Sequence, residues 1–397
     1  MDCLPVPSTQ CQGTILHGPF RILTTSFILF KSKSCSSLAF VAATMPNQMV
    51  FSPSSFSKRN DTPDHFILPD LVGHCSYTVR LNPNCDRMAR QSEKWLLKLA
   101  KHPRAKQIKF LGLKAGELTA ACYPDTDGFR LRVCDDFMNY LFNLDDWLDD
   151  FDVNDTYGMR NCCIGAMQDP QGFQTKKRAG RLTKHFFKRF AKGAGPGCRE
   201  RFIHSMDLFF TAVATQSRDR ADGITPDLES YITVRRDTSG CKPCFQLIEF
   251  AGDFDLPDEV VNHELIQNLE EATNDLVTWS NDIFSYNKEQ KYHDTHNMIT
   301  VVMNQYGFTL QQAVDFVGFK CKKSIENFEY DRNRLPSWGI EIDRMVEKYV
   351  DGLQNWIVGS LHWSFDTERY FSKDGHQIKK HRLVKLSPQV PLVVFQA

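Results

Sequence analysis

Apolar residues recur at three-, four- and seven-residue intervals through most of this chain, and almost no segment alternates with the period of two expected of a β-strand. Gly and Pro separate the periodic stretches, as in Gly195-Pro196-Gly197. No repeat of about 30–45 residues is present, which disfavours a helical solenoid. We therefore predict an all-α domain, with helices over residues 84–101, 128–150, 180–192, 199–220, 258–289, 308–331 and 340–363.

The two ends of the chain differ in composition from the part between them. Residues 1–44 hold three basic residues, one acid and many Ser, Thr and Cys, which fits a transit peptide or an upstream extension; we favour an extension, with Met45 as the natural start. Residues 46–65 are rich in Pro, Ser and Asn and are expected to be flexible. We therefore divide the chain into a disordered N-terminal extension at 1–65, a single domain at 66–375 and a C-terminal tail at 376–397.

Charge and cysteine content disfavour several classes of protein. Lys and Arg number 48, as do Asp and Glu, so the formal net charge is zero, whereas nucleic-acid binders usually carry a basic excess. No apolar run reaches the roughly 18–20 residues that span a bilayer. The 13 cysteines are interpreted as reduced thiols, and Cys241-x-x-Cys244 lacks a second pair at zinc spacing. We expect a cytoplasmic protein without a transmembrane segment or nucleic-acid partner, either a monomer or a homodimer.

An acidic run ends one of the predicted helices, directly after the apolar positions Leu141 and Leu144. Asp145 and Asp149 lie within about 40° of each other around a helix, and Asp152 returns to nearly the same angle. Carboxylates on one face repel each other unless a divalent cation neutralises them or water solvates them. The run therefore predicts either metal ligands at the rim of a pocket or a solvated helix end.

A second polar pattern lies on a later predicted helix. Asn281, Ser285 and Glu289 follow an i, i+4, i+8 spacing and fall within an arc of about 80° on one face. Amide, hydroxyl and carboxylate oxygens suit Mg²⁺, which prefers oxygen ligands, keeps several waters and often binds with substrate phosphates. The alternative is a polar stripe on an ordinary amphipathic helix.

Basic residues accompany these two patterns. Arg369-Tyr370 directly follows an apolar helix, the pair Arg235-Arg236 precedes the second pattern, and Lys288 lies inside it. Guanidinium and ammonium groups are natural donors to a phosphate. Taken together, these residues describe a diphosphate held by Mg²⁺ on one side and by cations on the other.

The combined pattern resembles class I terpene synthases, and most closely the sesquiterpene cyclases of mushroom-type fungi. Residues 145–149 match the aspartate-rich motif of that family, residues 281–289 match its second metal motif in full, and Arg369-Tyr370 matches its late Arg-Tyr pair. The likeness extends from about residue 64 to 375 and includes the segment Asp294-Thr295-His296-Asn297.

The resemblance implies a single-domain helical bundle around a deep apolar pocket, with three Mg²⁺ ions at its mouth. The implied metal ligands are Asp145, Asp149, Asn281, Ser285 and Glu289. The implied diphosphate-binding residues are Lys288, Arg369, Tyr370 and one of Arg235 and Arg236. The separation from Asn281 favours Arg235, whereas the position of Gly240 favours Arg236, and the sequence leaves the choice open. The implied catalytic set is Asp145, Asn281, Ser285, Glu289, Arg369 and Tyr370.

The implied reaction is the Mg²⁺-dependent ionisation of farnesyl diphosphate, followed by cyclisation to a sesquiterpene and release of diphosphate. Such a site must stabilise the leaving anion and keep water from the carbocation. Aromatic faces attract cations. Candidates for an aromatic lining are Phe137, Tyr140, Phe142, Trp279 and Trp363, although each also fits plain core packing. The sequence indicates neither which sesquiterpene is formed nor whether a shorter or longer substrate is used.

Two other functions remain open at the level of sequence. Residues 176–199 contain nine basic residues and no acid, a stripe that fits an RNA- or anion-binding helical protein without catalysis, or simply a solvated helix face. The second alternative is a chain-elongating prenyl diphosphate synthase, which uses two aspartate-rich motifs. The second motif here carries Asn, Ser and Glu instead, which favours a cyclase.

Overall fold

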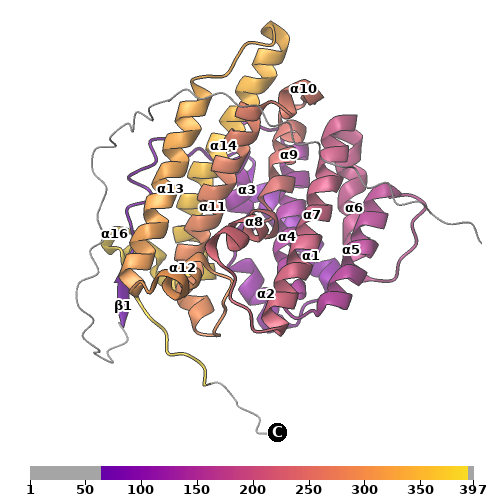
Figure 1. Ribbon diagram of the computed structural model, residues 1–397. Coiled ribbons are helices and arrows are strands. Elements are labelled where there is room, and N and C mark those ends of the chain that lie inside the picture. Colours follow the sequence, from indigo (N-terminus) through magenta and orange to yellow (C-terminus); the bar gives the residue numbers. More distant parts are fainter. Residues whose placement is uncertain (1–63, 392–397) are drawn as a thin grey trace, which may run out of the picture. The chain divides into compact units, whose positions relative to one another are not determined.

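Helices form nearly all of the regular structure in the described part of the chain, residues 64–391 of a computed structural model (Figure 1). The expected N-terminal extension, with its alternative start at Met45, lies almost entirely outside these residues. The α-helices are α1 (Cys85–Ala100), α2 (Arg104–Leu111), α3 (Ala115–Cys122), α4 (Gly128–Leu148), α5 (Val153–Gln168), α6 (Arg178–Gly193), α7 (Pro196–Ala221), α8 (Leu228–Thr238), α9 (Cys241–Gly252), α10 (Asp258–Val261), α11 (Glu264–Gln290), α12 (Met298–Tyr306), α13 (Leu310–Arg332), α14 (Ile340–Asp366), α15 (Glu368–Phe371) and α16 (Gly375–His381). The remaining elements are β1 (His65–Ile67), β2 (Leu383–Lys385) and a short 3-10 helix, η1 (Ser372–Asp374).

The long helices pack side by side around a shared core. α11 lies against α13 and α14, α4 lies against α1, α6 and α9, and α7 lies against α5, α8 and α9. In Figure 1, α11, α13 and α14 occupy one side of the bundle and α5, α6 and α7 the other. Phenylalanine rings fill much of the second side: the ring centroids of Phe190 and Phe202 are 4.8 Å apart, and Phe137 lies 5.0 Å from Phe202. Burial of such apolar surface contributes about 25 cal/mol per Å² and holds the helices together.

Aspartate side chains fix the starts of α4 and α5. The carboxylate of Asp127 accepts hydrogen bonds from the backbone N–H groups of Phe129 and Arg130, which otherwise lack partners at a helix start. Asp152 accepts a hydrogen bond from the N–H of Asp155 in the same way. These caps fix the first residues of α4 and α5. They therefore help to fix the position of the acidic run that joins the two helices.

The prediction of one continuous helix over 258–289 is wrong in one respect, because non-helical residues separate α10 from α11. His263 has an extended backbone, and its ring nitrogen Nδ1 accepts a hydrogen bond from the N–H of Leu265. This cap starts a new helix axis, so Val261 does not continue the apolar face of α11. The polar positions near the end of α11 are unaffected.

Six helices of eight or more residues were missed by the sequence prediction: α2, α3, α5, α8, α9 and α12. α3 and α9 are buried on nearly all sides, so they have no polar face and produce no helical period. α2 and α12 contain only eight and nine residues. Short or fully buried helices therefore account for most of these omissions.

β1 and β2 form the one antiparallel strand pair of the described residues. Phe66 lies opposite Val384, and both side chains are buried. Each strand has three residues, too few to show an alternating pattern in the sequence. The pairing ties α16 and β2, which lie in or next to the segment predicted as a C-terminal tail, to the start of the ordered domain.

Two properties bear on the predicted environment of the protein. No helix within residues 64–391 has the length and apolar character needed to cross a membrane. The cysteines of the same residues carry free thiols, and most of them are buried.

Candidate active site

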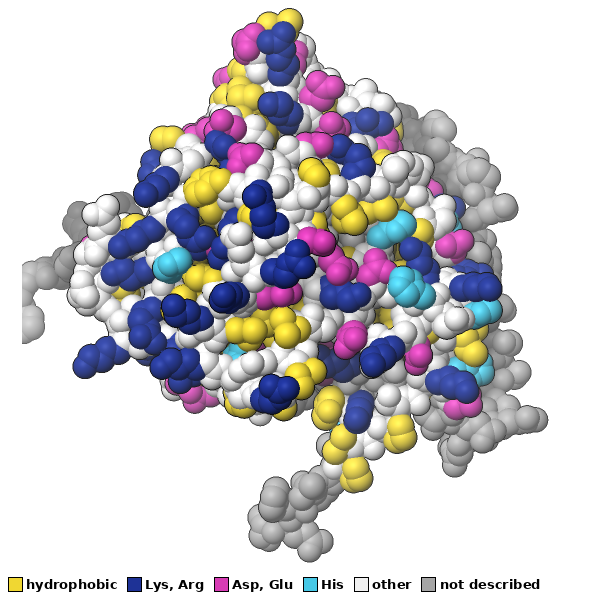
Figure 2. All heavy atoms as spheres, turned by 180° about the vertical axis from the view of Figure 1, so that it is seen from behind, with side chains coloured by type: hydrophobic (Ala, Val, Ile, Leu, Met, Phe, Trp, Pro, Cys, Tyr) yellow, Lys and Arg dark blue, Asp and Glu magenta, His cyan; other side chains and the backbone are white. Residues whose placement is uncertain are grey.

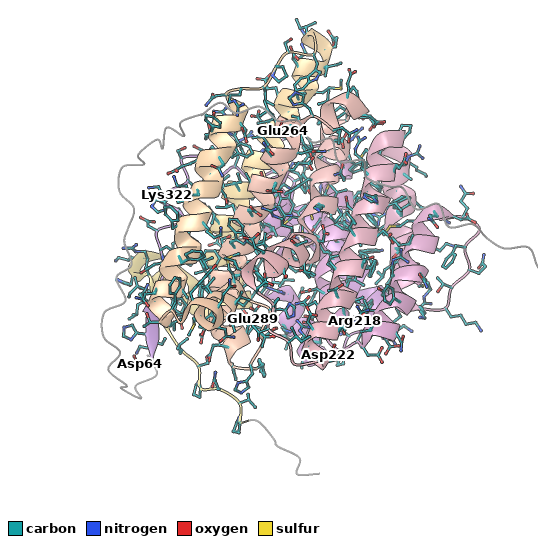
Figure 3. The ribbon with its side chains drawn as sticks, viewed as in Figure 1. Asp64, Arg218, Asp222, Glu264, Glu289 and Lys322 are labelled. Atoms are coloured by element: carbon teal, nitrogen blue, oxygen red, sulfur yellow. The ribbon has the colours of Figure 1, made fainter. Side chains whose placement is uncertain are left out.

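A cavity of about 210 Å³ extends into the bundle at the end where α4, α7 and α11 terminate. Figure 3 shows this end: Glu289 of α11 lies on the same side as Arg218 and Asp222 of α7, and Glu264 marks the opposite end of α11. Apolar side chains form part of the cavity wall, among them Leu118, Met138, Leu141, Phe209, Val213 and Trp356. Polar residues of both sequence motifs, among them Asp145, Asn281 and Glu289, form another part.

Asp145 and Asp149, at the end of α4, both line this cavity. The Oδ2 atom of Asp145 lies 3.2 Å from the Nη2 atom of Arg369. The Oδ1 atom of Asp149 lies 3.6 Å from the Nη1 atom of Arg220. Partial desolvation, reinforced by the neighbouring Asp145 carboxylate, raises the pKa of Asp149 to about 6. The two carboxylates therefore repel each other and are held by arginines from two other helices.

The other acids of the run point elsewhere. The carboxylate of Asp146 lies 3.8 Å from the ammonium nitrogen of Lys106 and 3.7 Å from that of Lys109, both on α2. Asp150 is exposed to solvent. The expectation that Asp152 shares the face of Asp145 is wrong, because α4 ends at Leu148 and Asp152 caps α5.

The three polar positions of the second motif occupy one face of α11, as their spacing predicts. Asn281 and Glu289 line the cavity. Glu289 accepts a hydrogen bond of 2.8 Å from the amide of Asn297, and burial together with the Asp294 carboxylate raises its pKa to about 7. Ser285 is not among the residues that line the cavity; it is 4% exposed, and its Oγ atom has no hydrogen-bond partner within residues 64–391.

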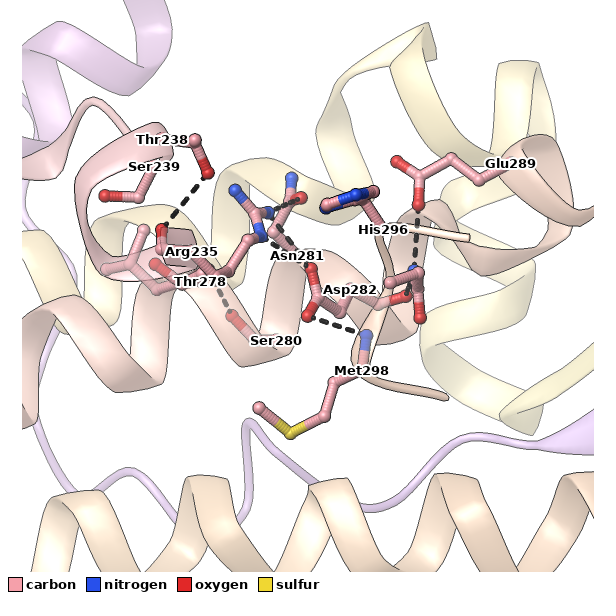
Figure 4. Close-up of polar contacts among 12 residues, drawn as sticks. Arg235, Thr238, Ser239, Thr278, Ser280, Asn281, Asp282, Glu289, His296 and Met298 are labelled. Atoms are coloured by element: carbon pink, nitrogen blue, oxygen red, sulfur yellow. Dashed lines mark hydrogen bonds and ion pairs between the residues drawn. The ribbon is translucent and has the colours of Figure 1, made fainter. Parts of the chain in front are cut away.

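Arg235 and Arg236 face different surroundings, which bears on the choice that the sequence leaves open. Arg235 lines the cavity and donates from Nη2 to Asn281 at 2.9 Å and to Asp282 at 3.0 Å (Figure 4). Arg236 forms a two-pronged contact with Asp275 at 2.7 and 2.8 Å and does not line the cavity. The geometry therefore brings Arg235, and not Arg236, into the candidate site.

Asp282 explains how Arg235 is held in place. Its side chain is 1% exposed and accepts hydrogen bonds from Arg235, from the hydroxyl of Tyr231 at 2.5 Å and from the backbone N–H of Met298 at 3.2 Å. Burial raises the pKa of Asp282, and the Arg235 guanidinium opposes that effect. A charged residue next to Asn281 thus serves as an anchor for the cation rather than as part of the cavity wall.

The consecutive residues Arg369 and Tyr370 connect the two motif helices. Arg369 contacts Asp145 of α4, and the Asn281 amide of α11 donates a hydrogen bond of 2.6 Å to the Tyr370 hydroxyl. Both side chains line the cavity. Two helices that carry residues more than a hundred positions apart therefore meet at one short helix, α15.

Lys288 lies between the main cavity and a smaller side cavity of about 120 Å³. The side cavity is also lined by Lys106, Lys109 and Arg369. Desolvation, and then the positive charge of Arg369, lower the pKa of Lys288. The polar end of the cavity is therefore rich in cations as well as carboxylates.

Two of the five aromatic candidates line the cavity. The ring centroids of Phe142 and Trp363 are 5.6 Å apart, and the Arg369 guanidinium carbon lies 5.3 Å from the Phe142 centroid. The cavity is also lined by Phe209 and Trp356, which carry no distinguishing signal in the sequence.

The other three aromatic candidates lie outside the cavity and pack in the core. Phe137 packs against Phe202, the Tyr140 hydroxyl lies 2.9 Å from that of Thr183, and the Trp279 ring faces the ammonium group of Lys320 at 5.1 Å. The helical period marks these positions as inward-facing but does not distinguish a cavity from a packed interior.

Sequence reasoning also missed polar residues that complete the site. Arg220 of α7 lies 3.4 Å from Asp294 as well as 3.6 Å from Asp149, so it links the ends of the two motif helices. His296 lines the cavity, and its Nε2 atom lies 3.7 Å from Asp219. The segment 294–297 resembles the family in sequence, whereas nothing around Arg220 distinguishes it from a surface arginine.

The donor set fits a hard divalent cation. The unpaired Ser285 hydroxyl lies on the same helix face as the Asn281 amide oxygen and the Glu289 carboxylate, and all are oxygen donors. In the described residues, no three His, Cys, Asp or Glu side chains gather into a complete metal site. Mg²⁺ takes few protein ligands and fills its shell with water and phosphate oxygens.

A helical bundle with two oxygen-rich helices facing one end cavity is the architecture of class I terpenoid synthases. Solved structures agree: the chain superposes on germacradien-4-ol synthase from Streptomyces citricolor with a TM-score of 0.64 at 23% identity, covering 73% of this chain and 96% of that one. A linalool/nerolidol synthase from Streptomyces clavuligerus gives a TM-score of 0.67 at 21% identity, covering 72% and 98%. At such low identity the likeness concerns the fold alone.

Sequence comparison shows the family to which the chain belongs. Residues 136–327 match the family model described as terpene synthase family 2, C-terminal metal binding. Sesquiterpene synthase 1 of Postia placenta is 51% identical over 85% of this chain and 99% of its own length. Alpha-muurolene synthase of Coprinopsis cinerea is 51% identical over 85% and 82%, and delta(6)-protoilludene synthase of Armillaria gallica is 32% identical over 81% and 94%. The chain belongs to the terpene synthase family, among the fungal sesquiterpene synthases, and is a metal-dependent terpene cyclase.

Proposed function

We propose that this protein ionises farnesyl diphosphate in a Mg²⁺-dependent reaction and cyclises the resulting carbocation to a sesquiterpene. The observation that carries the proposal is the convergence of the two motif helices at Arg369 and Tyr370, which contact Asp145 and Asn281 around one cavity. The choice of a 15-carbon substrate is supported by the names of the 51% identical relatives.

The metal ligands in this proposal are Asp145, Asp149, Asn281, Ser285 and Glu289, and three ions are expected when diphosphate is bound. When bound, Mg²⁺ neutralises the negative charge that develops on the departing diphosphate. The unpaired Ser285 hydroxyl supports this assignment, because a buried donor without a partner is costly unless a ligand engages it.

The diphosphate-binding residues in this proposal are Arg235, Lys288, Arg369 and Tyr370. Their charges are fixed before the substrate arrives: Arg235 is anchored by Asp282, and Arg369 stacks near Phe142. Preorganised donors stabilise a developing anion without having to reorient during the reaction. Arg236 is left out of the set, because its guanidinium is occupied by Asp275.

The apolar wall of the cavity acts after ionisation. The carbocation must be shielded from water until it has cyclised, and rings such as Phe142, Phe209, Trp356 and Trp363 offer apolar faces that attract a cation. The reaction ends when the final cation loses a proton or is captured by one admitted water molecule. The identity of the product follows from the contour of this wall.

A product assay tests the proposal directly. The purified protein is incubated with Mg²⁺ and with geranyl, farnesyl or geranylgeranyl diphosphate in turn, and the headspace is examined by gas chromatography. We expect a C15 hydrocarbon or alcohol from farnesyl diphosphate that disappears on adding a chelator. No product from farnesyl diphosphate, or longer prenyl diphosphates formed on adding isopentenyl diphosphate, would count against the cyclase. The cytoplasmic location and the choice between monomer and homodimer stay predictions.

A further inference from the structure

The zero net charge of the chain conceals a strong separation of charge along it. Residues 85–109 and 176–199 together contain 17 of the 48 Lys and Arg residues but only 2 of the 48 Asp and Glu residues. These two segments form α1, most of α2 and α6. The rest of the chain therefore carries a matching excess of acid.

α1 and α6 lie next to each other and run in opposite directions. The indole N–H of Trp95 donates to the ring of His185 at 2.9 Å, and the guanidinium of Arg178 donates to the backbone oxygen of Ala100 at 3.1 Å. These contacts hold the C-terminal half of α1 against α6. Their outward faces consequently form one continuous surface.

Eight exposed basic side chains cover this surface, and we name them the basic ribbon. They are Arg87, Lys94, Lys98 and Lys101 on or next to α1, and Lys177, Arg181, Lys188 and Lys192 on or next to α6. Within each set the spacing is three, four or seven residues, so each set follows one face of its helix.

The charge of the basic ribbon is not neutralised by the described part of the protein. Within residues 64–391, none of its eight side chains lies within 4.0 Å of a carboxylate. The buried carboxylate beneath it, Asp136, is occupied by Arg132 and Arg189. Seen from behind, Lys and Arg side chains crowd the side on which α6 lies in Figure 1, which is the left side of Figure 2.

α2 follows α1 in the chain and carries exposed apolar side chains. Ile108 is 62% exposed and Leu111 is 44% exposed, and the helical period places both on the same face as Arg104, opposite the side chains that line the side cavity. In residues 85–111 and 176–199, these are the large apolar side chains most exposed to solvent. Lys109 of α2 lies 3.7 Å from Asp146, and both residues line the side cavity.

We propose that the basic ribbon and the outer face of α2 dock the protein on an anionic lipid surface. A membrane with acidic headgroups complements unpaired cations over a broad face, and protruding aliphatic side chains can enter the headgroup layer. A single-stranded nucleic acid would instead be favoured by exposed aromatic rings that stack on bases, whereas the exposed apolar side chains of α2 are the aliphatic residues Ile108 and Leu111. The docking does not depend on catalysis. If the proposed function holds, it places the cavity mouth near the phase in which a 15-carbon chain and a hydrocarbon product dissolve.

Vesicle binding by the full chain tests this proposal. Large vesicles of phosphatidylcholine, with or without about 25% phosphatidylserine, are mixed with the purified protein and floated on a density gradient. We expect binding to the anionic vesicles only, decreasing as salt is raised, because exposed charges are screened at high ionic strength. Equal binding to both vesicle types, or binding to neither, would overturn the proposal.

Matched charge reversals distinguish the effect of the basic ribbon on vesicle binding from the effect of net charge alone. The ribbon variant K94E/K98E/R181E/K188E is compared with K322E/K323E/R344E/K348E, which makes the same change in net charge at exposed positions of α13 and α14. We expect the ribbon variant to lose more than about a hundredfold in vesicle partitioning, and the control variant less than about tenfold. Circular dichroism shows whether each variant is folded, and any variant that is not folded is replaced by Lys→Gln and Arg→Gln changes at the same positions.

Two further results bear on the kind of partner. The variant I108S/L111S should reduce vesicle binding while leaving the salt dependence of the remaining binding unchanged, because it removes apolar contact and changes no charge. Equal losses in the ribbon and control variants would overturn the proposal. So would tight binding of a single-stranded RNA by a wild-type protein that ignores the anionic vesicles, because the ribbon would then be a nucleic-acid surface.

Discussion

The hydroxyl of Ser285 shows how one residue can be kept available for a ligand. Burying a hydroxyl without a partner costs about 1–3 kcal/mol, a cost that is removed when an ion or another group binds it. The other two polar side chains on this helix face already have hydrogen-bond partners: Asn281 contacts Arg235 and Tyr370, and Glu289 contacts Asn297. Ser285 is therefore the position at which ligand binding and protein stability can be separated most cleanly.

We expect Ser285→Ala to raise the Mg²⁺ concentration needed for half-maximal diphosphate release by at least about tenfold, the loss that even outer-shell partners of a metal cause. The thermal unfolding midpoint should stay the same or rise slightly, because no hydrogen bond within the protein is lost. Ser280→Ala is the matched control: Ser280 is equally buried on α11, but its hydroxyl donates to the backbone oxygen of Val277 at 3.1 Å. A control that needs as much Mg²⁺ as Ser285→Ala would refute the ligand assignment.

The two neighbouring arginines offer a second comparison between single residues. Arg235→Lys keeps the charge but loses the fork that bridges Asn281 and Asp282, so we expect turnover to fall by at least about a hundredfold. Arg236→Lys should stay within about threefold of the wild type, because its partner Asp275 lies outside the cavity. Diphosphate release gives the rates, and thermal unfolding shows whether either variant is merely unstable. Equal losses of turnover would mean that the sensing arginine has been misassigned.

Glu289 and Asp149 are proposed metal ligands with pKa values raised to about 7 and about 6, so we expect metal binding to depend on pH. Below these values the carboxyl groups hold protons that Mg²⁺ must displace, so the Mg²⁺ concentration for half-saturation should fall as pH rises from about 6 to 8. The folded pKa of Glu289 lies above its ordinary value, so its contribution to the stability of the metal-free protein is present at low pH and is lost as pH rises through about 7. Titration of tryptophan fluorescence with Mg²⁺ at several pH values measures the first effect. Glu289→Gln should flatten the dependence, and an unchanged slope in that variant would show that other groups titrate.

At the scale of elements, the end of α4 distributes its acids among different partners. Asp145 faces the cavity, Asp146 faces the lysines of α2, and Asp152 starts the next helix. The acids of this one run therefore have different surroundings, because α4 ends within the run.

We therefore expect Asp145→Asn to reduce turnover by at least about a hundredfold, because it weakens a proposed metal ligand and its contact with Arg369. Asp150→Asn should have little effect, since Asp150 is exposed and lies outside the cavity wall. Rates of diphosphate release at saturating Mg²⁺ compare the two variants. If both variants are impaired to the same degree, the ligand has been placed at the wrong position in the run.

The elements that could be predicted from the sequence are those with one apolar and one polar face. α4, α11, α13 and α14 are long and amphipathic, and the helical period of α11 is by itself enough to put three oxygen donors on one face. α3 and α9 were missed because they are buried on nearly all sides and show no period.

The parts of the site that could not be predicted depend on how the elements pack. Arg220 joins the site only because α7 ends beside both motif helices, and Phe209 and Trp356 face a cavity rather than a packed core for the same reason. Local sequence fixes which face of a helix is buried, whereas the neighbour that covers that face is set by the fold as a whole. The choice between Arg235 and Arg236 belongs to this second category.

At the scale of the whole molecule, the candidate site joins segments that are far apart in the chain. Asp145 and Arg369 are separated by 224 positions, and Asn281 and Tyr370 by 89. Cations and carboxylates face one another across the cavity, and the protein's own groups compensate these charges only in part. A ligand that satisfies both signs at once should therefore stabilise the entire bundle rather than one helix.

Thermal unfolding of the whole protein tests this coupling without any catalytic turnover. Mg²⁺ alone leaves the arginines unsatisfied, and inorganic diphosphate alone meets the carboxylates without a neutralising cation, so we expect each to raise the unfolding midpoint only slightly. Together, at about a hundred times their dissociation constant, they should stabilise the folded state by about 2.7 kcal/mol. Asn281→Leu serves as the comparison, because it removes a donor and the contact with Tyr370. Strictly additive shifts in the wild type would mean that the metal and diphosphate sites are independent, and that the two helices do not form a common centre.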